Sequence, residues 1–399
     1  MERRKVTYKL YPTPAQAQRM QDLLRAHKNL WNAALQERID AWKKAGVSIG
    51  YKQQCASLTQ IRRELPEDWA QMNCSSQQIT LRRLDKAFSA FFRRVKAGQT
   101  PGFPRFKSLR RMPGFGYKSH GDGWRFTFGD NGRHGTLRLQ GIGHIKARGR
   151  ARTAGVVKSC ELMHLGGVWH LSLTVECEPV RTGGGKAVAA DWGVEHLLSL
   201  VKSDGSTEHI ENPRWFRGAR DRIVALDQAV SRKRRGSKSR RRAAVQSARF
   251  KTRMARRRLD HHHKLSARIA AEVAVFATEE LRVANMTASA AGTLDAPGHQ
   301  VAQKSGLNRE ILDTAPSLLM QLIAYKVTET GGQFEKAPTR QLKPSQRCPA
   351  CWSLRKKTLN DRWHACACGH EEHRDMAAAR VVLRWAMGEI AGQELPPAA

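Results

Sequence analysis

The first hundred residues divide into one alternating stretch and a long run of helical periodicity. Residues 4–11 alternate polar with apolar or aromatic side chains, which predicts a β-strand. Thr13-Pro14 then predicts a helix start, because threonine caps helices and proline fits the first turn. Up to about residue 96 the apolar positions recur at helical spacing. We expect a helical bundle packed along two apolar stripes: Leu23, Leu24, Leu30, Trp31 and Leu35, followed by Leu81, Leu84, Phe88, Phe91 and Phe92.

Short strand-like segments follow a break at 98–106, a stretch that contains two prolines and two glycines. Glycine-rich turns separate these segments, and this spacing is typical of a small β-barrel. Residues 4–11 would supply its first strand, so the helical block looks like an insertion. Aromatic side chains in strands usually pack in a core rather than stack on bases, and we expect this of Trp124, Phe126 and Phe128. The predicted strands are 124–128, 135–140, 156–163 and 169–175.

A second domain is expected after the linker Gly183-Gly184-Gly185. Residues 186–191 and 197–201 are apolar runs around a tight turn, which predicts a hairpin whose first strand ends at Asp191. The later elements are predicted in this order: a very basic helical region (213 to about 260), a helix from 261 to about 274, an apolar run (275–281), a helix (317–330), a strand (332–336) and a final helix (375–390).

The charge of the chain narrows its choice of partners. Of 399 residues, 70 are Lys or Arg and 35 are Asp or Glu, so the formal net charge is +35. Compact domains with this excess repel themselves unless a polyanion neutralises them, and nucleic acid is the polyanion that fits. The basic residues are spread over the whole chain, and the hydrophobic fraction of 40% supports folded domains. We therefore expect extended nucleic acid bound against several domains.

The sequence also bears on location. No apolar run approaches the roughly 20 residues of a membrane span, and the first residues lack the apolar core of a signal peptide. Four of the eight cysteines (55, 74, 160 and 177) are scattered singly, which is typical of a reducing compartment. We expect a cytoplasmic, nucleoid-associated protein of a prokaryote with no membrane partner.

The other four cysteines form two close pairs, Cys348 with Cys351 and Cys366 with Cys368. Two such pairs across a short polar loop predict a zinc ribbon, because four thiolates can close a tetrahedron around one structural Zn²⁺. The second pair has the spacing C-x-C, so a ribbon without metal stays open as an alternative. A nearby histidine could also replace one thiolate: His364, His370 or His373.

Three carboxylates stand at the ends of apolar runs or turns, or just after them: Asp191, Glu279 and Asp375. Alone, each would be interpreted as a turn residue or a helix cap. Together they fit a two-metal phosphodiesterase centre, since Mg²⁺ prefers carboxylate oxygens and two ions about 4 Å apart can bind the attacking and leaving oxygens of a phosphate. The sequence thus predicts a site for two magnesium ions.

The same three segments resemble the split RuvC-like nuclease motifs of the TnpB family. These are insertion-sequence-encoded, RNA-guided DNA nucleases related to the compact type V CRISPR effectors. The family motif places the acid before a polar residue and a leucine, which selects Glu279 over Glu280. Ala377 and Trp352 depart from the pattern, since the family commonly has Asn and Gly there. The resemblance covers nearly the whole chain, through residues 187–193, 278–281 and 374–378 and through further signatures at 101–107, 262–266, 307–312 and 344–351.

The resemblance implies a multidomain α+β fold. It would contain an RNase H-like RuvC nuclease domain with an inserted zinc ribbon, and a β-barrel wedge domain interrupted by a helical recognition lobe. The implied ranges are 1–12 and 98–182 for the wedge barrel, 13–97 for the recognition lobe, 183–345 for the nuclease domain, 346–372 for the ribbon, and 373–399 for the nuclease C-terminal helix and tail.

The function that the resemblance implies is RNA-guided DNA cleavage. Asp191, Glu279 and Asp375 would be the catalytic acids that bind magnesium in a single site, which would cut both DNA strands in turn. A guide RNA from the end of the element would pair with double-stranded target DNA beside a short flanking motif. We expect one protein monomer per RNA.

The basic stretch 232–258 has two interpretations, as a solvated helix or as a nucleic-acid contact. The net charge favours phosphate contacts along a guide–target heteroduplex, which is recognised by shape. The adjacent residues 261–263 look like a metal tract, but neighbouring side chains on a helix point in different directions, so an RNA contact or a buried cap is favoured. The residues expected to contact nucleic acid are Arg105, Lys107, Lys233, Arg234, Arg235, Arg240, Arg241, Arg249, Arg253 and Arg257.

Two rival functions stay open at this point. One is a non-cleaving RNA-guided protein that represses transcription, and the presence of all three acids argues against it. The other is a conventional transposase that recognises transposon ends without RNA, for which no helix-turn-helix signature is evident.

Overall fold

The computed structural model describes residues 2–69, 71–151, 153–178, 181–293, 295–358 and 361–389. The chain forms two units, Met1–Pro179 and Val180–Ala399, and each is described by itself. Both combine helices with a sheet, so the protein is a mixed α+β protein of more than one domain. No helix among these residues has the length and apolar character needed to cross a membrane.

The first unit is built on a seven-stranded antiparallel sheet. The strand order is β2-β6-β7-β1-β5-β4-β3, so the first strand of the chain lies in the middle of the sheet, between strands that follow more than a hundred residues later. The strands are β1 (Glu2–Tyr11), β2 (Gly114–Tyr117), β3 (Trp124–Phe128), β4 (Arg133–Leu139), β5 (Gly143–Arg150), β6 (Val156–Leu165) and β7 (Val168–Cys177).

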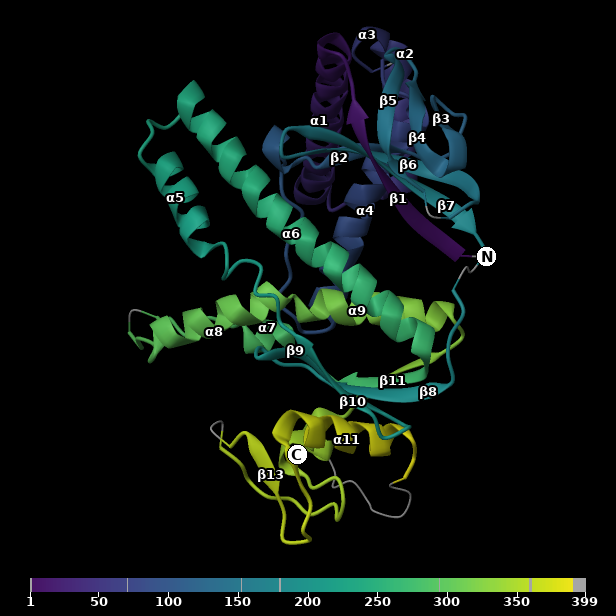
Figure 1. Cartoon of the computed structure of the whole chain (residues 1–399). Coiled ribbons are helices and arrows are strands. Elements are labelled where there is room, and N and C mark those ends of the chain that lie inside the picture. Colours follow the sequence, from purple (N-terminus) through teal and green to yellow (C-terminus); the bar gives the residue numbers. More distant parts are fainter. Residues whose placement is uncertain are drawn as a thin grey trace. The chain divides into compact units, whose positions relative to one another are not determined.

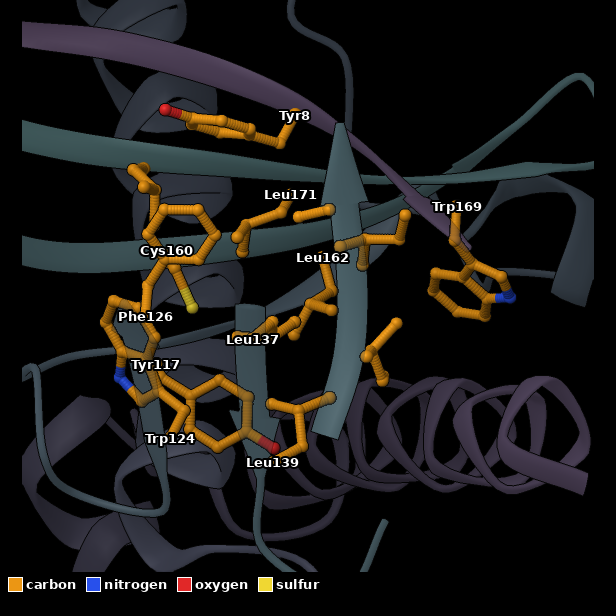
Figure 2. Packing of buried hydrophobic residues seen from close by; sticks show 14 of the residues in the cluster. Tyr8, Tyr117, Trp124, Phe126, Leu137, Leu139, Cys160, Leu162, Trp169 and Leu171 are labelled. Atoms are coloured by element: carbon orange, nitrogen blue, oxygen red, sulfur yellow. The ribbon is translucent and has the colours of Figure 1, made fainter. Parts of the chain in front are cut away.

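One aromatic and aliphatic core packs against this sheet (Figure 2). The Tyr8 ring on β1 lies 4.8 Å from that of Phe126 on β3, centre to centre. Tyr117 and Trp124 belong to the two edge strands β2 and β3, yet their ring centres are only 6.4 Å apart. The edges therefore curl toward each other over a shared core. Trp124 and Phe126 are buried in it, as the sequence predicts.

Four helices follow β1, and local capping explains where they begin. The Thr13 hydroxyl accepts from the Gln16 N–H, and the Asn73 side chain accepts from the Ser76 N–H. The helices are α1 (Pro14–Ala45), α2 (Tyr51–Glu64), α3 (Pro66–Trp69) and α4 (Cys74–Lys96); two short 3₁₀ turns, η1 (Leu109–Arg111) and η2 (Asp130–Gly132), come later in this unit.

The two predicted apolar stripes share one core over part of their length. Leu23 and Leu24 of the first stripe pack in the sheet core instead, and one end of the second stripe is on the surface. Leu30, Trp31 and Leu35 on α1 pack against Leu81 and Leu84 on α4. Further along α4, the Phe92 side chain is 59% exposed, so the prediction that the whole stripe is core is wrong there. Its aromatic neighbours, Phe88, Phe91 and Phe103, form a ring cluster with it.

The second unit is built on a five-stranded mixed sheet in the order β10-β9-β8-β11-β12. Strands β8, β9 and β10 form an antiparallel meander, whereas β11 runs parallel to β8 and β12 parallel to β11. The bounds are β8 (Lys186–Asp191), β9 (His196–Lys202), β10 (Thr207–Glu211), β11 (Val273–Glu279) and β12 (Gln333–Ala337).

Helices cover both faces of this sheet (Figure 1). On one face α6 (Lys238–Glu272) and α9 (Pro316–Glu329) enclose a core around the fully buried Phe276. On the other face α11 (Arg374–Ala386) packs on alanine and valine side chains of the strands. Strands buried on both faces have near-continuous apolar sequences, which is why β8 and β11 were recognisable.

The basic region at 213–260 is not one helix. It contains α5 (Arg220–Ser231), a turn at 232–237 in which Gly236 has φ 83°, and α6, which runs on through the histidines to residue 272. The remaining helices of this unit are α7 (Val283–Met286), α8 (Val301–Thr314), α10 (Thr339–Leu342) and the 3₁₀ turn η3 (Pro344–Gln346), and a small hairpin joins β13 (Trp363–Ala365) to β14 (Glu371–His373). The predicted end of the last helix, residue 390, lies outside the described residues.

Candidate functional site

Two of the three predicted acids lie at the same edge of the second sheet. Asp191 is the last residue of β8, and Glu279 is the last residue of β11. These strands run parallel with Ala190 opposite Thr278, so their carboxyl ends deliver both side chains side by side. Carboxyl ends of parallel strands are where such sheets commonly bind ligands.

The third acid comes from the C-terminal helix. Asp375 is in the first turn of α11, and Met376 and Ala379 of that helix are buried against the sheet. Asp375 interacts electrostatically with Asp191, and so does Glu279. The fold therefore gathers three carboxylates from segments separated by about ninety residues each. Glu280, the sequence neighbour of Glu279, is exposed instead and pairs with Arg282 at 3.8 Å.

The protein environment disfavours negative charge at this cluster. Burial, followed by the charges of Glu279 and Asp375, raises the pKa of Asp191 well above its usual value, and Arg374 only partly opposes this. Burial raises the pKa of Glu279 to about 7. All three residues stay partly accessible to solvent. Clustered carboxylates that repel one another and can be reached from solvent are an arrangement that divalent cations stabilise.

The helix that carries Asp375 is held by arginine side chains. The Arg380 guanidinium donates to Glu372 at 2.6 Å, just before the helix. Near its other end, Arg384 donates to the carbonyl oxygens of Pro349 and Ala350. Ala377, which departs from the family pattern, is buried in the contact with the sheet. These contacts anchor the helix without the expected asparagine.

A cluster of three histidines near Asp375 was not predicted from the sequence, which offered His373 only as an alternative zinc ligand. The His196 and His209 rings stack with centres 4.1 Å apart, and the His373 ring lies 5.0 Å from His209. Burial, followed by the neighbouring His196 and His373, lowers the pKa of His209, while Asp375 opposes the shift. The Ser199 hydroxyl hydrogen-bonds with His209 Nδ1 at 3.0 Å. The three rings can donate or accept hydrogen bonds beside the acids, but no spacing in the sequence predicts the cluster.

A cavity of about 260 Å³ opens beside Glu279. Its lining includes the Thr278 hydroxyl, a buried group with no hydrogen-bond partner among the described residues, together with Gln321 and Lys336. A cation and an amide next to the carboxylates are suited to a phosphate group of a substrate.

The four cysteines of the predicted ribbon converge as predicted. Their sulfur atoms all lie within 4.8 Å of one another; Cys348 to Cys368 is 3.7 Å and Cys351 to Cys366 is 3.5 Å. A tetrahedron with zinc–sulfur bonds of about 2.3 Å has edges of about 3.8 Å, so the thiols fit zinc without a histidine. Hydrogen bonds, above all from the Cys368 backbone, lower the pKa of Cys366 to about 6, which favours the thiolate.

Trp352 occupies a position that glycine would favour. Its φ is 66°, in the left-handed region, and its indole is buried between Arg347 and Arg384. The indole joins the core under α11. Trp352, which departs from the family pattern, therefore packs the ribbon against the helix that carries Asp375.

The predicted nucleic-acid residues are in different situations. Arg105 is exposed, whereas the Lys107 ammonium lies over the Trp31 ring, 3.4 Å from its centre. Arg240 donates to the Lys233 carbonyl and so closes the turn between α5 and α6. Of the residues predicted to contact nucleic acid, those exposed to solvent on and near this helical pair are Arg234, Arg235, Arg241, Arg249, Arg253 and Arg257. Of the three adjacent histidines, His262 is fully buried and bonds the Thr314 carbonyl, as the buried-cap interpretation predicts.

Three family models match parts of the chain. One, OrfB of IS605 elements, described as a probable transposase, matches residues 170–290. One described as the TNB domain of Cas12f1-like proteins matches 317–382, a range that includes the four cysteines and Asp375. One described as a helix-turn-helix domain matches 1–46 and corrects the expectation that no such signature is present, although residues 2–45 fold as one strand and one long helix.

Two relatives match over most of their length. An Escherichia coli (strain K12) protein named "Putative RNA-guided DNA endonuclease InsQ" is 29% identical over 353 residues, which cover 86% of this chain and 82% of the relative. A Streptomyces pristinaespiralis protein named "Putative RNA-guided DNA endonuclease" is 29% identical over 392 residues, or 96% of this chain and 89% of the relative.

A solved structure shares the fold. In the cryo-EM structure of a Cas12f1–sgRNA–target DNA complex, a chain matches 92% of this chain with a TM-score of 0.59 and 12% identity, and 82% of that chain is covered.

Proposed function

Since the chain belongs to the TnpB family of insertion-sequence proteins, we propose that it is an RNA-guided, magnesium-dependent endonuclease that cuts double-stranded DNA beside a short flanking motif. The observation that carries the proposal is the meeting of Asp191, Glu279 and Asp375 at one sheet edge, in an environment that disfavours the charges of Asp191 and Glu279. Two relatives named as RNA-guided DNA endonucleases support the same activity.

The topology supports a nuclease domain of RNase H type. An antiparallel meander followed by two parallel strands, with helices on both faces, is the arrangement of that fold, and the proposed RuvC-like domain (183–345 with 373–399) contains it. The curled seven-stranded sheet supports a wedge barrel from 1–12 and 98–182, interrupted by a recognition lobe at 13–97.

The three carboxylates would hold two magnesium ions. Bound there, the ions would activate a water nucleophile and stabilise charge on the leaving oxygen of the phosphodiester. The chain's own contribution is positional: two strand ends fix Asp191 and Glu279, and the anchored helix fixes Asp375. In the ribbon (346–372), the cysteines would hold a structural zinc ion.

The guide RNA and the target DNA would be bound by the basic surfaces. The chain has a net charge of +35, and the exposed arginines of α6 are suited to phosphate contacts along a heteroduplex. In the first unit, Arg105 is exposed and suited to phosphate contacts as well. We propose one protein monomer per guide RNA.

Plasmid cleavage with the RNA-loaded protein tests the proposal. We expect linearisation only when the guide matches a target beside the flanking motif, only with magnesium, and not with Asp191→Asn. Asp204→Asn, which makes the same change at an exposed carboxylate paired with Lys186 between β9 and β10, is the matched control and should cut normally.

Three other results are informative. If the wild type bound DNA in a guide-dependent way but did not cut it, the function would be that of a repressor and not of a nuclease. Tight binding of transposon ends without RNA would replace it by a protein-only transposase. Full cleavage by Asp191→Asn would show that the three carboxylates are not the catalytic site.

A further inference from the structure

The two helices α5 and α6 line a cavity. The proposed function gives its exposed α6 arginines a role in phosphate contacts, but it leaves the apolar part of the lining without a role. The cavity has a volume of about 900 Å³, within the usual range for ligand sites. The helices lie side by side, joined by the turn at 232–237 (Figure 1). Asp227 of α5 fixes their spacing, because its carboxylate accepts from the Ser247 hydroxyl at 2.7 Å and both of its oxygens accept from the Lys251 ammonium.

Five arginines line this cavity: Arg222, Arg241, Arg242, Arg249 and Arg253. The four arginines on α6 are adjacent or spaced four, seven to eight, or eleven to twelve positions apart, so they lie on one face of the helix. Within the described part of the chain, none of the five guanidinium groups has a hydrogen-bond or ion-pair partner. So many unpaired cations around one hollow repel one another, and an anion with several phosphate oxygens would relieve that repulsion.

The floor of the cavity is apolar rather than charged. Leu226, Val245 and Phe250 line it, and the Gln246 amide stands among them. Val245 is 38% exposed and Phe250 is partly accessible, so both are open to a ligand. A duplex offers phosphates on its outside but keeps its bases stacked inside, so it would leave this floor unused. An unpaired nucleotide offers both a flat apolar base and a phosphate.

We propose that the α5–α6 cavity binds an unpaired nucleotide of single-stranded nucleic acid, with the base against Phe250 and Val245 and the phosphates among the arginines. Gln246 carries both a donor and an acceptor and is suited to a base edge. Every base has a stacking face, so the site accepts any sequence. The proposal rests on the proposed function for its choice of nucleic acid, but it concerns a site separate from the three carboxylates.

Binding of short probes to the full-length chain tests this. The nucleic-acid-free protein is titrated with fluorescein-labelled oligouridine RNA, oligothymidine DNA, the same DNA carrying abasic sites, and a duplex of equal length. We expect Phe250→Ala to lower the affinity for both intact single strands about tenfold and to leave duplex binding unchanged. Abasic DNA should bind the wild type as weakly as intact DNA binds the variant.

A local readout and a matched control separate the cavity from other basic surfaces. Strands carrying 4-thiouridine or 4-thiothymidine should photocrosslink to the peptide around Phe250 in the wild type. Leu259→Ala, which also truncates an exposed apolar side chain of α6, should bind and crosslink normally. A loss with RNA alone or DNA alone would identify which strand occupies the site.

The proposal is overturned if Phe250→Ala binds intact strands like the wild type, or if abasic and intact strands bind equally. Either result would make the cavity a phosphate contact only. Because the readout is binding, an inactive nuclease would leave the inference standing, and a failed inference would leave guide-dependent cleavage standing.

Discussion

Glu279 should destabilise the metal-free protein, and Glu279→Gln should reveal this as a pH-dependent gain in stability. Burial raises the pKa of this carboxyl from its ordinary 4.5 to about 7. The folded state therefore holds its proton where the unfolded chain has released it. The penalty is absent below about pH 4.5, grows up to about pH 7 and is constant above that. Its full size is up to about 3 kcal/mol.

The assay is thermal unfolding by calorimetry in magnesium-free buffer at pH 5 and pH 8. At pH 8 the glutamine variant should be more stable by up to about 3 kcal/mol, or roughly 6–12 °C in Tm for a unit of this size. At pH 5 the difference should shrink below about 1 kcal/mol. Magnesium should narrow this difference, since a hundredfold excess over Kd adds about 2.7 kcal/mol to a protein that binds it. The variant, with one ligand fewer, should gain less.

Glu280→Gln is the matched control, because its carboxylate is exposed and pairs only with Arg282. We expect it to shift stability by less than about 0.5 kcal/mol at either pH. The reasoning is refuted if Glu279→Gln is less stable than the wild type at pH 8, or if its gain is the same at pH 5.

Two further predictions concern structure away from the acids. Metal analysis should find about one zinc ion per chain. The variant Cys366→Ser should lose the zinc and have a lower Tm, whereas Cys74→Ser should keep both the zinc and the Tm. Equal zinc content in both variants would contradict the four-cysteine site. Phe276→Ala should lower the free energy of unfolding, measured in urea, by about 3–5 kcal/mol, because the fully buried Phe276 ring stacks on Phe334 in the sheet core. A loss below about 1 kcal/mol would contradict that packing.

Elements with a strong local signal were predictable from the sequence. The first strand and α1 follow from alternation and a threonine cap, and β8 and β11 from apolar runs. The strand β5 was missed because only Ile145 and Ala147 of it are buried, while its other side chains are largely basic, polar or glycine. The strand β2 was missed because its four residues, Gly-Phe-Gly-Tyr, are too short and too glycine-rich for a pattern.

The candidate site was predictable only in part. Asp191 and Glu279 end recognisable apolar runs, so each carries a local mark, and the resemblance then grouped them with Asp375. The cluster of His196, His209 and His373 has no such mark. It exists because β9 pairs with β10 and because the ribbon returns the chain to the sheet just before α11. Such a group depends on tertiary pairing, which single-sequence patterns do not contain.

The cysteine ribbon contacts the helix that carries Asp375, so it helps to position the acid cluster. Trp352 packs in the same core as Met376, the residue after Asp375, and Arg384 of α11 bonds the carbonyls of the first cysteine knuckle. Arg347 in turn donates to the carbonyls of Leu342 and Trp352, which closes the knuckle against the sheet side of α11. A zinc ion bound by the four thiolates would hold in place the knuckle that makes these contacts. Zinc would therefore support catalysis by holding the helix that positions the third carboxylate, without itself touching the substrate.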